Sequence, residues 1–344
     1  MFTMGQVSEA SSRTTTVVGI DEAGYGPLLG PLVVSAVAFD VPVALMKSLD
    51  DAAAGPNLWE VLRASVSESP KKRDPRLAIA DSKKLHGKAS KTAGIRLIEQ
   101  AVLAFLAQQG PLPDSLQGLL SRVAGRSSDG LSRYPWYTAD AVPVPYECTS
   151  ATLATQAHAL GADLAANGMR FRGAWVEVLP EGHYNDLVER THNKATVLFD
   201  RTTRLIQRVA DHVGNVPLRV WVDRQGGRIT YRRGLMRAFP DAELDVLEES
   251  PERSSYRLRR PNAPQLVRFV MKGESHHMQI ALASLFSKYL RELFMLCLNR
   301  YWAAEVADLR PTAGYYTDGK RFLADIEPAL VRQKIDRRLL VRSS

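Results

Sequence analysis

The sequence predicts an α/β protein built on a mixed central sheet flanked by helices. Between residues 16 and 39, two apolar, β-branched runs flank a turn rich in Gly and Pro, a pattern typical of two strands joined by a loop. Further along, short runs of the same kind alternate with longer segments whose apolar residues recur at helical spacing. Strands first, then such alternation, indicate a mixed sheet covered by helices.

Helical segments are predicted to follow this two-strand unit. Residues 45–74 read as an amphipathic helix followed by a basic linker, and a helix over residues 90–109 ends at Gly110 and Pro111. Residues 110–170 begin with a stretch rich in Gly, Ser, Pro and aromatic residues, so we expect an irregular insertion that closes with a helix.

The second half of the chain alternates strands with helices. Strands are expected at residues 171–179 and 217–223 and, as two or three strands, within 244–271, and helices at 185–213, 232–238 and 276–298. Residues 299–344 are more polar and helical in pattern, and we expect them to form an extension that packs on the same domain. No internal repeat interrupts this order.

Composition limits the class of protein. With 344 residues, 45% hydrophobic and 24% charged, the chain is typical of a soluble protein of one large domain or two ordinary ones. No apolar run reaches the roughly 18 residues of a membrane span. Residues 1–15 lack a secretory signal and are expected to be a flexible tail. Cys148 and Cys297 form no metal-type pair, which suits a reducing compartment. We therefore expect a cytoplasmic protein without a membrane partner.

The chain carries a net charge of +8, which favours a polyanionic partner. A generally basic, soluble protein without such a partner explains the charge equally well. Charge alone therefore leaves the ligand open.

Acidic residues directly follow two predicted strands. Asp21 and Glu22 follow the first apolar run, and strand alternation places Asp21 on the same face as Val17 and Gly19. Asp223 closes a second strand before a Gly-rich turn. A partly buried carboxylate costs several kcal/mol unless it is paired or holds a metal. Because Asp also caps turns, a purely structural role stays open for both positions.

A polar stripe lies on the otherwise apolar helix over residues 276–298. Ser284, Lys288 and Glu292 fall at i, i+4 and i+8, on one face. One interpretation is a Lys288–Glu292 pair that faces solvent. The other places Glu292 beside Asp21 and Asp223 as a ligand for divalent ions.

Magnesium prefers oxygen ligands and keeps several waters, so a few carboxylates and a substrate phosphate make a sufficient site. Two such ions about 4 Å apart can drive phosphodiester hydrolysis without a cysteine or histidine nucleophile. His276 and His277 are accordingly interpreted as polar residues at a helix start.

Several motifs, in order along the chain, resemble those of the ribonuclease HII family. They are DEAGYGPLLGP at 21–31, DSKKL at 81–85, a helical block at 193–209, VDRQGGRITYRRGLMRAFP at 222–240, KGESHHMQIALASLFSKYLRELFM at 272–295 and GYYT at 314–317. The resemblance implies a ribonuclease H-like fold. It also implies a single catalytic domain over 16–298 that exceeds the usual family size through insertions near 45–74, 110–170 and 246–266.

The resemblance implies four acidic ligands, Asp21, Glu22, Asp223 and Glu292, that hold Mg²⁺ or Mn²⁺. The loop Gly24–Gly26 would approach the RNA 2′-hydroxyl, the group that distinguishes RNA from DNA, and Tyr315 would stack nearby. The residues expected to bind nucleic acid are Gly24, Tyr25, Gly26, Lys83, Lys84, Lys272, Ser284, Lys288 and Tyr315. Four positions depart from the family. Tyr25 stands where it usually has Arg or Lys, Glu274 and Glu292 stand where an Asp is expected, and Lys320 stands at the histidine position that follows the C-terminal motif.

The implied activity is endonucleolytic cleavage of the RNA strand of RNA/DNA hybrids, or of ribonucleotides embedded in duplex DNA. The sequence leaves the oligomeric state open, and a monomer is favoured. One alternative is a protein that binds nucleic acid on the same fold without turnover. Another is a partner-dependent subunit that docks through residues 110–170, where Pro135, Trp136 and Tyr137 form either an exposed contact or local core.

Overall fold

The structure is a computed structural model of the chain that describes residues 14–46, 55–69, 74–81, 85, 91–138, 142–260 and 263–343. Lys83 and Lys84, predicted to contact phosphates, lie outside the described residues. Residues 14 and 15, predicted as the end of the flexible tail, begin a strand instead. The β-branched Thr15 is buried there, and its hydroxyl donates to the carbonyl of Pro217.

Seven strands form the central sheet, in the order β5-β2-β1-β6-β9-β8-β7. Their bounds are β1 Thr14–Ala23, β2 Leu32–Pro42, β5 Arg170–Leu179, β6 Leu218–Asp223, β7 Glu243–Glu249, β8 Arg253–Arg259 and β9 Gln265–Val270. Strands β1, β6 and β9 are parallel, whereas β2 runs antiparallel to β1 and β5, and β8 runs antiparallel to β7 and β9. The predicted mixed central sheet is therefore confirmed. Two short strands, β3 (Val66–Ser67) and β4 (Leu77–Ala78), pair separately.

Helices flank the sheet, as predicted. Their bounds are α1 Leu58–Val61, α3 Lys91–Leu106, α4 Leu116–Val123, α5 Pro135–Thr138, α6 Ser150–Ala166, α7 Glu181–Thr191, α8 Lys194–Val213, α9 Arg232–Ala238, α10 Met278–Glu305 and α11 Tyr316–Arg332. Short 3₁₀ turns are η1 Val43–Leu45, η2 Ala107–Gln109, η3 Gly125–Arg133, η4 Gly273–Ser275 and η5 Arg337–Leu339. Among the described residues, no helix combines the length and apolar character needed to cross a membrane.

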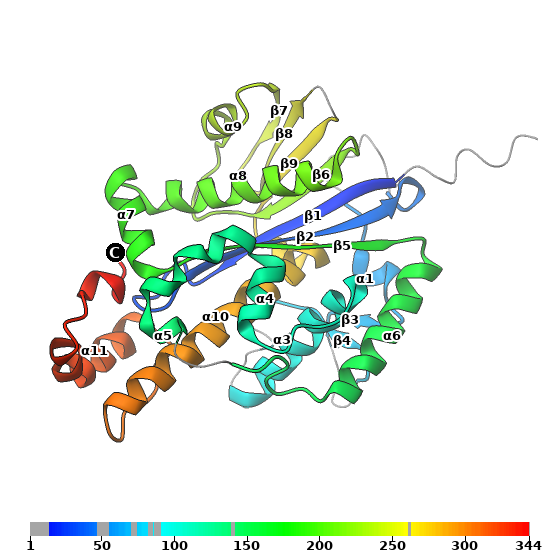
Figure 1. Cartoon of the computed structure of the whole chain (residues 1–344). Coiled ribbons are helices and arrows are strands. Elements are labelled where there is room, and N and C mark those ends of the chain that lie inside the picture. Colours follow the sequence, from blue (N-terminus) through cyan, green and yellow to red (C-terminus); the bar gives the residue numbers. More distant parts are fainter. Residues whose placement is uncertain are drawn as a thin grey trace, which may run out of the picture.

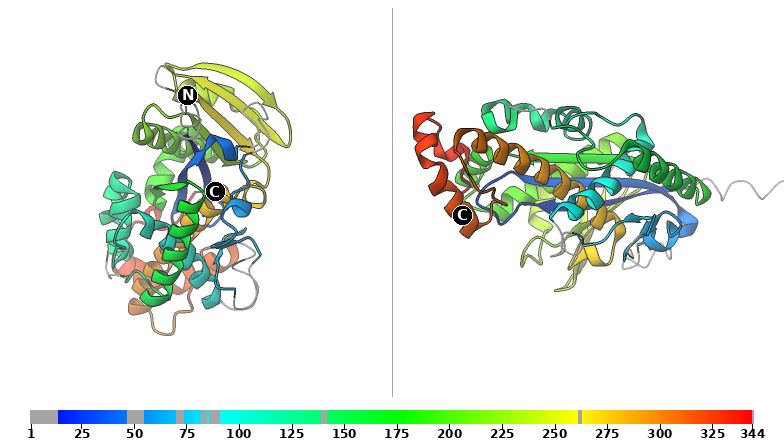
Figure 2. Two further views of the ribbon diagram at one scale, coloured as in Figure 1. Left: turned by 90° about the vertical axis from the view of Figure 1, so that its right-hand side faces the viewer. Right: turned by 90° about the horizontal axis from the view of Figure 1, so that it is seen from below.

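The sheet separates two hydrophobic cores, and helices cover both of its faces (Figures 1 and 2). Alternation along β1 sends Val17 into the core under α10, while Val18 and Ile20 pack into the core under α8. Helix α10 approaches β1 so closely that a Cβ on Gly19 would lie 2.1 Å from the backbone carbon of Gln279. This glycine therefore lets the long buried helix cross directly over the central strand.

The region over residues 110–170 is more regular than predicted. It contains α4, η3 and α5 before α6, and these pieces lie beside α10 and β5 (Figure 1). Trp136 and Tyr137 are buried, and the Tyr137 ring lies 4.9 Å from that of Phe294 on α10. The aromatic residues at 135–137 are thus local core, because burial of their large rings against α10 orders a segment of weak local propensity.

Two predicted helices have different bounds in the structure. The described residues of 45–74 contain only one helical turn, α1. The predicted helix over 185–213 is broken into α7 and α8, because His192 adopts a left-handed conformation and Asn193 caps the next helix. The Asn193 side chain accepts from the backbone N–H groups of Ala195 and Thr196, so it starts α8 as a separate helix.

Candidate active site

Asp21 stands near the end of β1, beneath α10, and its side chain is buried. Its exposed fraction is 6%. Burial raises the pKa of this carboxyl well above its usual value, and the charges of Glu22, Asp223 and Glu274, in that order, raise it further. A hydrogen bond from Ser284 on α10 lowers the pKa and partly offsets these effects. The structure thus surrounds one buried carboxyl with three further acids.

Parallel strands bring Asp223 and Glu274 to the same edge of the sheet as Asp21. Asp223 ends β6, which pairs in parallel with β1, and Glu274 lies in η4, directly after β9. The backbone N–H of Gly273 donates to Asp223 Oδ1 at 2.6 Å. A Cβ on Gly273 would lie 3.2 Å from that oxygen and 2.5 Å from Ile280 Cδ1. Glycine therefore allows η4 to approach the Asp223 carboxylate closely.

Ser284 connects helix α10 to the acids. Its Oγ lies 3.3 Å from Glu274 Oε2 and hydrogen-bonds Asp21 as well. One turn further on, Ser287 donates to the backbone carbonyl of Asp21 at 3.0 Å. These contacts fix the height of α10 relative to the carboxylates.

Glu292 forms an ion pair on its own helix. Its Oε1 lies 2.7 Å from Lys288 Nζ, the alternative pairing that the helical spacing had left open. Eight residues separate it from Ser284, which places its Cα about 12 Å further along the helix axis. The acids whose charges raise the pKa of Asp21 are Glu22, Asp223 and Glu274, and a role of Glu292 as a metal ligand stays a prediction.

The signal for Glu274 was present in the sequence. It lies in the turn after β9, four residues beyond the end of that strand, whereas Asp21 lies within β1 and Asp223 ends β6. The carboxyl ends of parallel strands meet at one edge of a sheet. The sequence pattern did not show that β9 is the parallel neighbour of β6, which only the tertiary pairing establishes. The neighbouring histidines lie at the start of α10, as predicted. Burial lowers the pKa of His277 to about 4, and its ring lies 5.8 Å from that of Trp221.

The loop after β1 passes beside the acids. Gly24 has a φ of +85°, and a Cβ there would lie 2.5 Å from the carbonyl oxygen of Pro31, so this turn requires glycine. Gly26 has open space around it. Tyr25 is partly buried, and Lys194 Nζ lies 5.5 Å from the centre of its ring. A cation thus stands beside the Tyr25 ring.

Arg342, which the sequence pattern did not reveal, holds this loop through hydrogen bonds to its backbone. The guanidinium of Arg342, near the end of the described chain, donates to the carbonyls of Gly24 and Tyr25, the latter at 2.7 Å. Arg342 is buried, and it lies 4.4 Å from the centre of the Tyr184 ring. No local motif marks such a contact, because it joins residues more than 300 positions apart.

The predicted stacking residue lies next to the same loop. Tyr315 is 55% exposed, and the Arg291 guanidinium lies 6.0 Å from its ring centre. The carbonyl of Gly314 accepts from the backbone N–H groups of Leu28 and Leu29 at 2.8 and 3.1 Å. These contacts bring residues 314–316 beside the loop that follows β1. Lys272, also predicted to bind nucleic acid, is exposed at the entrance to η4.

The carboxylates lie near one another, but their arrangement does not surround a position for a metal ion. Within the part of the chain that the structure describes, no three His, Cys, Asp or Glu side chains are arranged to hold a metal ion as they stand. Metal binding by these residues therefore stays a prediction.

Comparison with known proteins finds local similarity to ribonucleases HII. No family model matches the sequence. The chain is 51% identical over 41 residues to ribonuclease HII of Xylella fastidiosa (strain M12) and 45% identical over 51 residues to that of Xanthomonas oryzae pv. oryzae. These stretches cover 12% and 15% of this chain, and they span only 18% and 20% of the length of the relatives.

Comparison of folds finds solved ribonucleases HII and HIII. The ribonuclease HII of Archaeoglobus fulgidus, solved with PCNA, has a TM-score of 0.39 and 16% identity over 95% of this chain and 93% of that one. Ribonuclease H2 of Pyrococcus horikoshii has a TM-score of 0.40 and 13% identity over 94% and 92%. Bst-RNase HIII in complex with Mn²⁺ has a TM-score of 0.41 and 13% identity over 96% and 67%. At these low scores, the fold class is established by the strand order and directions of the sheet.

Proposed function

We propose that this chain, whose sequence matches support a protein of the ribonuclease HII type, is a divalent-metal-dependent endoribonuclease. Its substrate is the RNA strand of RNA/DNA hybrids, or ribonucleotides within duplex DNA. The observation that carries the proposal is the convergence of Asp21, Asp223 and Glu274, beside Glu22, at the carboxyl edge of the parallel strands.

The chemistry of the acids fits a divalent cation. A buried carboxyl held among three other acids has its pKa raised, so its ionised form needs a compensating positive charge. An all-oxygen donor set is the kind that Mg²⁺ and Mn²⁺ prefer. Asp21, Glu22, Asp223 and Glu274 would hold these ions. When bound, such ions activate a water and stabilise the leaving oxygen of a phosphodiester.

The chain's own contacts position these ligands. The Gly273 N–H holds Asp223 through one carboxylate oxygen, and Ser284 contacts both Asp21 and Glu274. These second contacts orient the carboxylates before an ion arrives, which lowers the cost of assembling the site. Lys288 pairs with Glu292 further along α10, so the charge of that acid is balanced on its own helix.

Recognition of RNA is assigned to the loop after β1. The backbone of Gly24 and Gly26 can approach a 2′-hydroxyl because neither residue carries a Cβ. Arg342 fixes the carbonyls of this loop, and exposed Tyr315 stands ready to stack. Lys194 beside Tyr25 supplies a positive charge for a backbone phosphate.

The test is cleavage of a labelled RNA/DNA hybrid by the purified chain with Mg²⁺ or Mn²⁺, beside RNA/RNA and DNA/DNA duplexes of the same sequence. We expect products only from the RNA-containing hybrid, and none from the Asp21→Asn or Asp223→Asn variants. Salt-sensitive binding without product in either metal would instead favour a binding protein that has lost turnover. Product from Asp21→Asn at the wild-type rate would reject the proposed site.

A further inference from the structure

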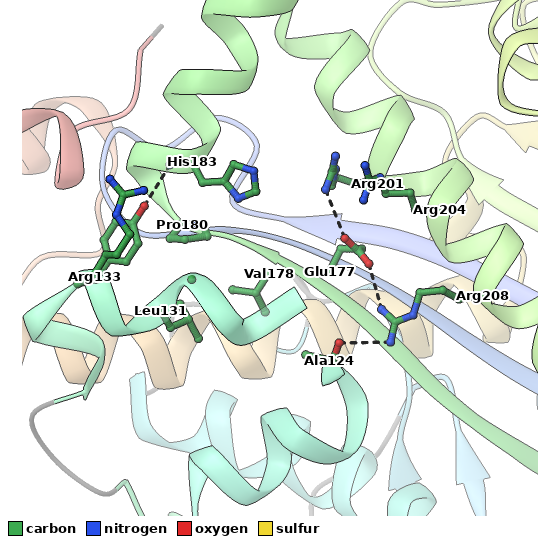
Figure 3. A pocket seen from close by; sticks show the side chains of 12 residues that line it. Ala124, Leu131, Arg133, Glu177, Val178, Pro180, His183, Arg201, Arg204 and Arg208 are labelled. Atoms are coloured by element: carbon green, nitrogen blue, oxygen red, sulfur yellow. Dashed lines mark hydrogen bonds and ion pairs between the residues drawn. The ribbon is translucent and has the colours of Figure 1, made fainter. Parts of the chain in front are cut away.

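A cavity lies away from the carboxylates, between the edge strand β5, helix α8 and turn η3. Its volume is about 650 Å³, and Figure 3 shows residues that line it. Volumes of this size are typical of pockets that hold a small ligand. The lining residues are Ala124, Gly130, Leu131, Arg133, Tyr134, Glu177, Val178, Pro180, His183, Arg201, Arg204 and Arg208.

Arginines dominate this lining. Arg201, Arg204 and Arg208 stand at i, i+3 and i+7 on α8, so they project from one face of that helix. Arg133 comes from η3, at the other end of the cavity (Figure 3). Glu177 is the one acid among the described lining residues, so with His183 neutral the lining carries a net formal charge of +3. The cavity therefore has an excess of positive charge.

The single carboxylate is shared by two of the arginines. Glu177 Oε1 lies 3.0 Å from Arg208 Nη1, and Glu177 Oε2 lies 3.5 Å from Arg201 Nη1. Arg201 is only 7% exposed, and its Nε has no hydrogen-bond acceptor among the described residues. A buried donor without an acceptor costs free energy that a ligand oxygen could recover. Burial, followed by the charge of Arg204, lowers the pKa of Arg201, although an arginine stays protonated in this setting.

The cavity is separate from the carboxylate site. In register across the sheet, Glu22 lies opposite Val34, and Val34 lies opposite Glu177. Two strand spacings separate Glu22 from Glu177 by about 10 Å. Asp21 points to the α10 side of the sheet, where its side chain contacts Ser284, whereas the cavity opens under α8. Glu22 shares the α8 side with Glu177, so the spacing of about 10 Å, and not the sheet, separates the cavity from that acid.

We propose that this cavity binds a phosphate group carried by a nucleoside-sized molecule or chain. Guanidinium groups match phosphate oxygens through paired hydrogen bonds, and a phosphate monoester carries enough charge to offset most of the excess. The cavity is much larger than a phosphate, and Leu131, Val178 and Pro180 give it apolar walls for an attached group. Two kinds of molecule carry such a phosphate group: a free nucleotide and the backbone of a nucleic acid strand.

The experiment measures binding by calorimetry in the presence of a chelator, so it does not depend on the proposed nuclease activity. The probes are adenosine 5′-monophosphate, inorganic phosphate, adenosine and an RNA/DNA hybrid. The variants are Arg133→Gln and Arg204→Gln, which change two exposed residues of the lining. Arg257→Gln removes one charge from β8, outside the cavity, and serves as the matched control.

If the source is a free nucleotide, the monophosphate binds, adenosine does not, and each lining variant weakens binding about tenfold, as expected for one lost charge-assisted hydrogen bond. If the source is a strand backbone, only the hybrid binds, and the lining variants weaken its binding more than Arg257→Gln does. Equal effects of lining and control variants on every probe, or no binding of any phosphate-bearing probe, would overturn the proposal. Unchanged circular dichroism confirms that each variant is folded.

Discussion

At the scale of single residues, the candidate site consists of carboxyl groups placed where their negative charge is costly. Asp21 has its pKa raised by burial and by neighbouring acids. A group whose folded pKa lies above its unfolded value stabilises the fold fully only below the unfolded pKa, and that stability is lost as the pH rises. At neutral pH without metal, ionised Asp21 therefore works against folding.

The Asp21→Asn variant tests this cost. Asparagine keeps the shape but cannot ionise, so in chelator at pH 7 we expect the free energy of unfolding to increase by about 0.5–3 kcal/mol, the usual range of a single substitution. Added Mn²⁺ should raise the melting temperature of the wild type but not of the variant. Denaturation curves with and without metal measure both. A variant that is less stable than the wild type in chelator would contradict the assignment.

Glu181 gives a second prediction about stability and pH, independent of the one for Asp21. It is fully buried, and burial raises its pKa to about 7 although Gly30 N–H and Tyr137 OH donate to its Oε1 at 3.0 and 2.8 Å. The folded value lies above the ordinary value of 4.5, so stability should fall as the pH rises from that value toward neutrality. Glu181→Gln keeps the acceptor, and unfolding measured from pH 4.5 to 8 should lose this part of the pH dependence. An unchanged slope would contradict it.

At the residue scale, the acids that directly follow an apolar run could be predicted from the sequence. Asp21 and Asp223 come directly after apolar runs, so their place at the sheet edge could be predicted. Glu274 and Arg342 could not be selected in this way, because their roles arise from contacts between distant segments. The stripe that suggested Glu292 is a Lys–Glu helix pair, which has the same spacing as a pair of inward-facing ligands.

At the scale of elements, the contact between α10 and β1 sets the position of the site. Gly19→Ala should disturb it, since the added Cβ would meet the backbone carbon of Gln279 at 2.1 Å. Overpacking against backbone typically costs 1–3 kcal/mol, and we expect about that loss or more in the free energy of unfolding. Gly227→Ala, where a Cβ meets nothing within 4 Å, is the matched control and should change little. Equal stability of the two variants would argue against this close crossing.

The C-terminal segment that carries Arg342 contacts the loop after β1. Asn185 on α7 donates to the carbonyls of Arg338 and Val341, and thereby holds the segment that carries Arg342. Arg342→Met would remove the donors to the Gly24 and Tyr25 carbonyls, so kcat/KM on the hybrid should fall about tenfold or more.

Arg338→Met is the control for that variant. Arg338 lies on the same segment, but its ion pairs with Asp186 and Glu189 are exposed, and exposed pairs contribute little. Its kcat/KM should stay close to the wild-type value. A similar loss in both variants would mean that the segment acts only through general stability.

Elements were predictable where their apolar period was long and regular. Strands β1, β2, β5 and β6 and helix α10 were expected close to their observed places. The break between α7 and α8 escaped prediction because a single left-handed residue and one capping Asn interrupt a continuous apolar stripe. The order within residues 110–170 depends on packing of aromatic rings against α10, which no local pattern encodes.

At the scale of the whole molecule, the sheet order explains how acids from three parts of the chain meet. Strands β1, β6 and β9 are parallel neighbours, so the residues that follow them lie at one edge. The mixed α/β class was predictable from alternation of strand and helix patterns. The pairing of β6 with β9 was not, because a parallel partner separated by a long excursion leaves no local trace.

The most direct test compares Glu274→Gln with Glu292→Gln, two identical changes on acids that sequence reasoning and structure rank differently. The measurement is kcat on one labelled RNA/DNA hybrid at saturating Mn²⁺. Loss of a group that stabilises developing charge lowers kcat on the order of 100-fold, which we expect for Glu274→Gln, while Glu292→Gln should stay within about threefold of the wild type. A large loss in Glu292→Gln with little change in Glu274→Gln would contradict the site described.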